Sequence, residues 1–542
     1  MYLIENPVLQ RELLVNLRMK KAFILQMAYV ALLGVMVYFA WPGDEKIDMA
    51  NSEKSVRLVN LFFLGQYILV GLMTPTFAAG AITGEKERKT YELLLASPLR
   101  PAAIVLGKML ASLALLALLM FSSLPIVMLC LPLGGTSIYE VLAVYLALLL
   151  ATGTFGLVSL YCSMRFQRTA AALVVSYLAI LPLALLGLLF WYTMGHGEFV
   201  RFRLFVTVAV LPPLCIALWT VLIMRISNRL LYPPDVGSEG KEVVDEEYEQ
   251  QHAVGLIIRR DQFPDRLFAP PKRTGLMPDG ANPVYDKEMR SEIFSQGTLM
   301  LRIVIQVSMF LAIPLMAWCL YLKPQFAPWY IGYVVLFNML VGPVFSAGSV
   351  TSERERQTLD LLLTTLIKPR QILFGKLLSG LRVSSVLTGF LLWPLVLACL
   401  MVTDYWSNLV TMLGYTAIVL ITCLFTATLA LFCSVLSRKT SVSLTAVYAV
   451  VVVLFMAPIA VQVFAGTFFP GSQGTHLAAE TSFVSPIATA FSLPLDLDRE
   501  GVEPRVGEPW VFTKFVVFYS LLTGVLMSSM IWLFGKRWRV AY

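Results

Sequence analysis

Charged residues are scarce in this sequence and make up only 14% of its 542 residues. An ordinary soluble domain carries about 25%, and the hydrophobic share of 58% and the mean hydropathy of +0.75 point the same way. Apolar runs such as 23–40, 103–131 and 442–464 are long enough to cross a bilayer, because a transmembrane helix needs about 20 such residues. The composition therefore predicts an all-α, polytopic membrane protein.

Signatures of catalysis and of metal binding are also missing. The three histidines, His196, His252 and His476, have no neighbours at the spacing of metal ligands. The sequence contains no G-x-x-x-x-G-K-[ST] loop to hold the phosphates of ATP. The seven cysteines fall in predicted spans or at their inner edges, which indicates no disulfide framework. We expect no catalytic, cofactor-binding or metal site on this chain.

Hydropathy divides the sequence into twelve predicted spans. They lie near 22–40, 57–82, 102–131, 138–161, 170–194, 204–224, 299–321, 330–350, 371–402, 408–432, 440–465 and 512–535. Most of the 42 lysines and arginines fall on the side that both termini share, so the positive-inside rule predicts cytoplasmic termini. Contact with membrane lipid headgroups explains the net charge of +8. We expect no nucleic acid partner, because no soluble face combines clustered basic residues with aromatics.

One charged stretch occurs twice. ITGEKERKTYELLLASPLRPAAIVLGK at 82–108 aligns without a gap to VTSERERQTLDLLLTTLIKPRQILFGK at 350–376, with 12 of 27 positions identical. The match extends outside the stretch, since Asn6-Pro7-Val8 corresponds to Asn282-Pro283-Val284. Two copies in the same orientation predict two parallel units with a path between them.

The repeat and the hydropathy together predict three regions. Residues 1–226 and 281–542 are each expected to form a six-span unit, opened by an amphipathic segment. Residues 227–280 are rich in proline, glycine and charge, which predicts a partly disordered cytoplasmic linker. A docking or regulatory role for this linker is the alternative.

The repeated stretch predicts a short amphipathic helix on the cytoplasmic side. Its charges cannot lie in hydrocarbon, where an Arg or Asp costs roughly 3 kcal/mol at the centre of a span. Ser352 and Glu355 have the spacing of a capping box, which predicts that the helix starts there. Pro101 and Pro369 suit the first turn of the next span. We expect the three consecutive leucines to face the membrane or the bundle and the charges to face the cytosol.

Eight charged side chains are the candidate contacts for a soluble partner that moves this helix. They are Glu85, Glu87, Arg88, Glu92, Glu353, Glu355, Arg356 and Asp360. Arg88 and Glu92 are four residues apart, as are Arg356 and Asp360, so one ion pair is expected along each helix. The alternative is an ordinary positive-inside loop. Topology demands basic residues there, but it demands neither the glutamates nor the common spacing.

The pattern E-x-E-R-x-T-x-[ED]-L-L-L, followed by proline and I-x-x-G-K, resembles the loop between the second and third spans of type-2 ABC exporter permeases. The resemblance implies a coupling helix that docks on a separate cytoplasmic ABC ATPase. Two such subunits are implied, and they carry the ATP and magnesium. It also implies export across a bacterial cytoplasmic (inner) membrane, through a pore whose two halves are fused here. Ser97-Pro98 becomes Thr365-Leu366 in the second copy, so the docking sites are not expected to be equivalent.

Polar residues inside the predicted spans are few. The second and fifth spans line the path in the family that the chain resembles, so Gln66, Thr74 and Asn338 are candidate path-lining residues. The alternative is helix packing, because such side chains form hydrogen bonds between helices. Residues 466–510 form the one large outer segment, and its apolar first part resembles the short re-entrant helices of that family.

Two other classes of protein stay open. A twelve-span secondary transporter of the major-facilitator kind also has two parallel units, but its G-x-x-x-D-[RK]-x-G-[RK]-[RK] loop is absent from both copies. A membrane-bound enzyme or scaffold would need clustered catalytic groups or a larger soluble domain. The transported substrate is left open, since an apolar path suits lipid-like molecules, peptides or drugs.

Overall fold

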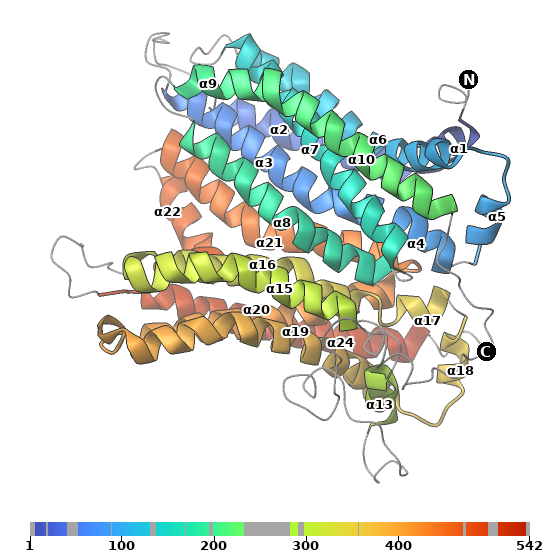
Figure 1. The fold of residues 1–542 in the computed structure, drawn as a ribbon. Helices are drawn as coiled ribbons and strands as arrows, with labels where there is room; N and C mark the ends of the chain where they lie inside the picture. Colours follow the sequence, from blue (N-terminus) through green and yellow to red (C-terminus); the bar gives the residue numbers. More distant parts are fainter. Residues whose placement is uncertain are drawn as a thin grey trace. The chain divides into compact units, whose positions relative to one another are not determined.

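The computed structural model describes most of the chain. The described residues are 6–17, 20–40, 53–87, 89–130, 137–166, 169–194, 199–231, 282–290, 298–355, 357–469, 473–496 and 508–537. They form helices joined by short turns, and no β-strand occurs among them (Figure 1). The prediction of an all-α protein is confirmed.

The chain separates into two compact units, Met1–Val236 and Gly237–Tyr542. The helices of the first unit are α1 Pro7–Leu17, α2 Lys20–Ala40, α3 Glu53–Ala78, α4 Gly80–Glu87, α5 Tyr91–Leu95, α6 Pro101–Cys130, α7 Ile138–Arg165, α8 Thr169–Thr193, α9 Phe199–Phe205, the π-helix η2 Val206–Val210 and α10 Leu211–Leu231. Because α10 continues to Leu231, the predicted linker 227–280 begins inside a helix, and its part from 232 on lies outside the described residues.

The second unit repeats this order of helices and adds short outer ones. Its elements are α13 Pro283–Arg290, α15 Thr298–Met316, η3 Ala317–Leu322, η4 Pro324–Phe326, α16 Ala327–Ala347, α17 Thr351–Glu355, α18 Leu359–Leu363, α19 Pro369–Met401, η5 Thr403–Tyr405, α20 Leu409–Leu436, α21 Thr440–Phe468, α22 Gln473–Glu480, η6 Thr481–Val484, α23 Pro486–Ser492 and α24 Pro509–Arg537. The short helices expected in the outer segment 466–510 are present as α22, η6 and α23.

Ten helices among the described residues are long and apolar enough to cross a membrane. They match ten of the twelve predicted spans. The other two predictions, 22–40 and 299–321, correspond to α2 and to α15 with η3, and the latter carries a shorter apolar run at Gln306–Leu322. The prediction of a polytopic membrane protein is confirmed.

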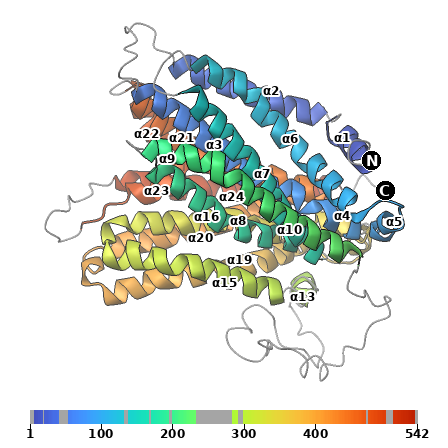
Figure 2. The same cartoon turned by 45° about the horizontal axis from the view of Figure 1, so that its top comes forward.

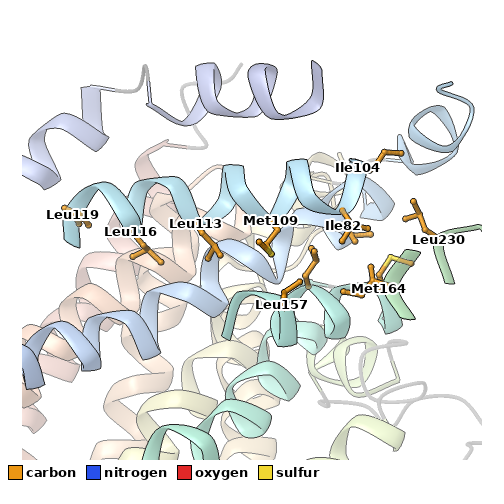
Figure 3. Packing of buried hydrophobic residues seen from close by; sticks show 12 residues of the cluster. Ile82, Ile104, Met109, Leu113, Leu116, Leu119, Leu157, Met164 and Leu230 are labelled. Carbon is orange, nitrogen blue, oxygen red and sulfur yellow. The ribbon is translucent and has the colours of Figure 1, made fainter. Parts of the chain in front are cut away.

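Within each unit, the same pairs of helices pack together. In the first unit α3 contacts α6 and α7, and in the second α16 contacts α19 and α20. The amphipathic helix that opens each unit packs on the third span, α1 on α6 and α13 on α19 (Figure 2). Apolar residues recur every three or four positions along α6, so Met109 and Leu113 point toward Leu157 of α7 (Figure 3). These contacts hold the ends of the spans on which the repeated stretch lies.

Candidate functional site

The repeated stretch forms two short helices in each unit. We call α4 with α5 the first repeated element and α17 with α18 the second repeated element. Lys89 and Gln357 separate the two helices of their elements, and both have φ of 58°. The expectation of one continuous helix is wrong, because a residue in the left-handed region ends a helix.

The break follows the Schellman pattern of hydrogen bonds. The amide of Thr90 donates to the carbonyl of Glu85 at 3.0 Å, and the amide of Lys89 donates to the carbonyl of Lys86 at 3.1 Å. In the second repeated element, Thr358 donates to Glu353 at 2.9 Å and Gln357 to Arg354 at 3.2 Å. A lysine and a glutamine occupy the position that glycine usually takes, so the sequence gives little local sign of this turn.

Glu87 and Glu355 each bind the first residue of the fifth span of their unit. Glu87 accepts hydrogen bonds from the Thr169 amide at 2.8 Å and the Thr169 hydroxyl at 2.7 Å. Glu355 accepts the same pair from Thr440, at 3.2 and 2.7 Å. These carboxylates lie at the N-termini of α8 and α21, where the helix dipole favours negative charge.

The capping box predicted between Ser352 and Glu355 does not form. The amide of Ser352 donates to the carbonyl of Gly348 at 2.9 Å, so Ser352 lies within a helical turn and not at a free helix start. The carboxylate of Glu355 is directed to Thr440 of another helix. The spacing of Ser352 and Glu355 in the sequence could not show whether Glu355 caps its own helix or the start of another helix.

The preceding basic residue binds the end of the fourth span. Lys86 donates from Nζ to the carbonyls of Met164 at 2.7 Å and Phe166 at 3.1 Å. Arg354 donates to the carbonyls of Val435, at 3.1 Å, and Ser437. A cation at a helix C-terminus satisfies carbonyls that lack a partner within the helix and opposes the helix dipole.

A serine near the end of the fourth span accepts two backbone amides of the repeated element. Ser163 Oγ accepts from Ile82 at 3.2 Å and from Thr83 at 2.9 Å. Ser434 Oγ accepts from the amides of Val350 and Thr351, both at 3.1 Å. With the contacts above, the first helix of each repeated element is bound to the end of the fourth span and the start of the fifth.

A buried lysine connects each repeated element to the amphipathic helix. Lys108, near the start of α6, is 5% exposed, and its Nζ lies 3.1 Å from Glu85 and 3.8 Å from Glu12 of α1. A buried ammonium group must be paired, because an uncompensated charge in the interior is strongly destabilising. Lys108 therefore holds α1 and the first repeated element together.

The second unit has the same arrangement with one further cation. Lys376 is 1% exposed, and its Nζ lies 2.5 Å from Glu288 of α13 and 3.6 Å from Glu353. Lys287 adds an ion pair to Glu353 at 2.7 Å. Burial would raise the pKa of Glu353, but hydrogen bonds from Lys287 and Thr358 and the charge of Lys376 outweigh it and lower that pKa from 4.5 to about 2.

The glycine before each lysine allows the amphipathic helix to approach. A Cβ atom at Gly107 would lie 2.8 Å from Asn6 Nδ2, and one at Gly375 would lie 3.0 Å from the Tyr285 amide nitrogen. Asn6 donates to the carbonyl of Ala103 at 2.6 Å and accepts from the amide of Val8 at 3.1 Å, so it both caps α1 and binds α6. This close packing explains why the repeat keeps Asn and Gly-Lys.

The second helix of each repeated element presents an acidic residue and a leucine to solvent. Glu92 and Asp360 are exposed, and the leucines that follow, Leu93 and Leu361, are 74% and 69% exposed. The next two leucines of each triplet pack on the apolar cluster of their unit. The second and third leucines of each triplet therefore face the bundle, as one of the two expected sides, and the first leucine does not pack on it.

Comparison with known families agrees with this arrangement. The sequence matches the ABC-2 family transporter protein twice, over residues 7–232 and over residues 197–537. The chain belongs to the ABC-2 transporter family. No protein with a curated description matches it. As an ABC-2 protein it is a membrane-spanning component of an ABC transporter, and the resemblance seen in the repeated stretch is confirmed for both units.

The eight predicted contact residues of this ABC-2 protein divide into three groups. Glu85, Glu87, Glu353 and Glu355 make the internal contacts described above. Glu92 and Asp360 lie on the exposed side of α5 and α18. Arg88 and Arg356 fall outside the described residues, and so do the ion pairs predicted for them. Contact with an ATPase stays a prediction for the whole set.

The three candidate path-lining residues of the ABC-2 protein are all buried. Gln66 donates to Ser123 of α6 at 2.5 Å, and Asn338 accepts from Thr426 of α20 at 3.4 Å. Thr74 Oγ1 is buried without a hydrogen-bond partner among the described residues. Gln66 and Asn338 thus form hydrogen bonds between helices, which is the alternative role stated above. A role in lining the path stays a prediction.

Several residues of this network match between the two copies of the repeat but were not among the contact residues predicted from the sequence. Lys108, Ser163 and Thr169 contact the first repeated element from three other helices. Their counterparts in the second unit are identical residues, Lys376, Ser434 and Thr440. Identity between the two copies is the signal for these residues, because each lysine ends its copy of the repeated stretch and the serine and threonine follow it in the same order in both units.

Proposed function

We propose that this chain is the complete permease of an ABC exporter and that each repeated element docks on one subunit of a separate ATPase. The observation that carries the proposal is the duplicated element itself. Each copy presents an acidic residue and a leucine to solvent, and each is bound at its base to other helices of its unit. An exposed leucine beside a charge on a rigidly held helix is a suitable contact for a partner protein.

The contacts of the first helix allow movement to reach the spans. The first repeated element continues from α3, leads into α6, and binds the end of α7 and the start of α8. A force applied at α5 would therefore act on four spans of the unit through short, charge-assisted hydrogen bonds. The second repeated element has the same connections to α16, α19, α20 and α21.

The remaining parts of the proposal follow from the family and from the charge distribution. Two repeated elements imply two ATPase subunits per chain, and those subunits would bind the ATP and magnesium. The excess of lysine and arginine on one side supports cytoplasmic termini in a bacterial inner membrane. Export is the direction that the resemblance of the repeated stretch implies.

Co-purification of the tagged full-length chain from native membranes tests this proposal. We expect a P-loop ATPase to be recovered at two copies per chain. The double variant Leu93→Arg with Leu361→Arg should lose it, because both changed side chains are exposed and contact no core. Its melting temperature should match that of the wild type.

The matched control is Ser163→Ala with Ser434→Ala, which removes internal hydrogen bonds to the repeated elements and leaves the exposed leucines in place. We expect this variant to melt at a lower temperature and still to bind the ATPase when folded. A wild-type chain that purifies alone even after crosslinking in membranes would contradict the proposed function.

A further inference from the structure

The largest apolar difference between the exposed surfaces of the two copies lies just after the second helix of each repeated element. Leu366 is 105% exposed, whereas the first repeated element has Pro98 at the same position. The second copy therefore presents two exposed leucines, Leu361 and Leu366, and the first presents Leu93 and the smaller Pro98.

Leu366 is held outward by the residue that follows it. Ile367 packs on the apolar cluster of the second unit, as its counterpart Leu99 packs on the cluster of the first unit. The backbone is thus anchored in the same way in both copies, and the side chain at position 366 points away from the core. The change from proline to leucine at this position therefore adds exposed apolar surface to the second copy on a common frame.

The neighbours of Leu366 place it in water or among headgroups and not in hydrocarbon. Thr364, Thr365, Lys368 and Arg370 are all exposed, and charged side chains are strongly disfavoured inside the bilayer. A fully exposed leucine in such surroundings leaves apolar surface in contact with water, which a protein contact would remove.

We propose that the two repeated elements bind their ATPase subunits with different affinities, and that the second repeated element is occupied first. This inference rests on the proposed function. The partner is an ATPase surface with an apolar pocket for the leucine common to both copies, Leu93 or Leu361, and with an adjoining apolar patch that Leu366 covers. Pro98 is smaller and stiffer, and it covers less of that patch.

The size of the effect follows from the area of one leucine side chain. Burying about half of it corresponds to roughly a tenfold lower Kd. When the ATPase is limiting, singly occupied chains should therefore carry their subunit mainly on the second unit.

The test uses full-length chains in nanodiscs and, as probe, the ATPase subunit that co-purifies with the wild type. Leu93→Arg leaves only the second repeated element intact, and Leu361→Arg with Leu366→Arg leaves only the first. Without nucleotide, we expect the Leu93→Arg chain to bind the ATPase about tenfold more tightly.

Reciprocal changes at the differing position complete the test. In the Leu93→Arg chain, Leu366→Ser and Leu366→Pro should each raise Kd about tenfold, with an unchanged melting temperature because the side chain is fully exposed. In the chain that keeps only the first repeated element, Pro98→Leu should lower Kd.

Equal affinities of the two single-site chains, or no effect of either Leu366 variant, would overturn this inference and leave the proposed function intact. Absence of ATPase binding to the wild-type chain as well would overturn the proposed function and this inference together.

Discussion

At the scale of single residues, duplication shows which side chains hold the repeated elements in place. Thr169 and Thr440 illustrate this, because each gives both its amide and its hydroxyl to one glutamate. The charge of the acceptor makes such hydrogen bonds stronger than those between neutral groups. Glu87 and Glu355 are exposed, but their carboxylates already accept hydrogen bonds from these threonines.

Replacing Thr169 with valine should destabilise the first unit. Thr169→Val removes the hydroxyl contacts to Glu87 at 2.7 Å and to Thr83 at 3.3 Å with little change of shape. We expect a cost of about 2 kcal/mol, the range for a hydrogen bond to a charged group. Unfolding can be followed with a thiol-reactive dye, because Cys162 is buried until the unit opens. Thr169→Ser keeps the hydroxyl and should stay near the wild type.

The depressed pKa of Glu353 predicts an acid-sensitive second unit. Its carboxylate is deprotonated in the folded state down to about pH 2, whereas in the unfolded chain it takes up a proton near pH 4.5. Its contribution to stability is therefore complete above pH 4.5 and is lost as the pH falls from 4.5 toward 2. Glu353→Gln should be less stable than the wild type at pH 6, and the difference should shrink by pH 3. A constant difference would show that the charge is irrelevant.

At the scale of the element, the docking of the amphipathic helix α1 depends on how closely it can approach α6 at Gly107. Gly107→Ala would place a Cβ atom 2.8 Å from Asn6 Nδ2 and push α1 away from α6. Overpacking of this kind costs about 1–3 kcal/mol. Hydrogen exchange of residues 7–17 should become faster in this variant.

Gly84→Ala is the matched control for this change. Gly84 lies in α4, and a Cβ atom there would meet nothing within 4 Å. We expect this control to be neutral or slightly stabilising, since alanine is the better helix former. Combining Gly107→Ala with Asn6→Ala should relieve the collision but not restore the lost cap. If Gly107→Ala alone left the hydrogen exchange of α1 unchanged, the close approach of α1 to α6 would not be needed for docking.

Sequence patterns predicted the spans of these units much better than the local structure of the site. Hydropathy located the spans because each is a long apolar run with a clear signal. The break at Lys89 was missed because its residue type does not favour positive φ. The sequence also did not predict which leucine of the triplet leaves the core, because α5 has only five residues, too few for periodicity to show which side packs inward.

The contacts of the site were missed for a different reason. Glu87 meets Thr169 across 82 positions of sequence, and no local pattern reports a contact at that distance. The capping-box spacing of Ser352 and Glu355 was misleading for the same reason. The Glu355 carboxylate accepts a hydrogen bond from Thr440 of another helix and does not cap its own. Only comparison of the two copies carries this information within a single sequence.

At the scale of the whole molecule, each repeated element meets the same receiving residues. These are Lys108 and Lys376, Ser163 and Ser434, and Thr169 and Thr440. The two lysines also pair with Glu12 and Glu288 of the amphipathic helices. A chain whose residues 350–363 are replaced by residues 82–95 should therefore fold, because every polar partner is retained. We expect its melting temperature to stay within a few degrees of the wild type and its Leu366 to keep the second site the tighter one.

Extending the exchange to residues 350–376 should make the two docking sites alike. This longer replacement also removes Leu366, so the two Kd values for the ATPase subunit should converge. The measurement is the same nanodisc titration, with one site at a time blocked by an arginine at the exposed leucine. Convergence with the shorter replacement would instead assign the difference to α17 and α18 themselves.

The placement of the lysine contacts also bears on how the chain is made. Every polar contact of the first repeated element described above lies within the first 169 residues, and Lys108 can be neutralised by Glu12 only once α6 has entered the membrane. The N-terminal helix α1 can therefore dock through this ion pair only after the third span has been made. Because domains fold in order as the chain emerges, the first unit can complete this docking before translation reaches the second.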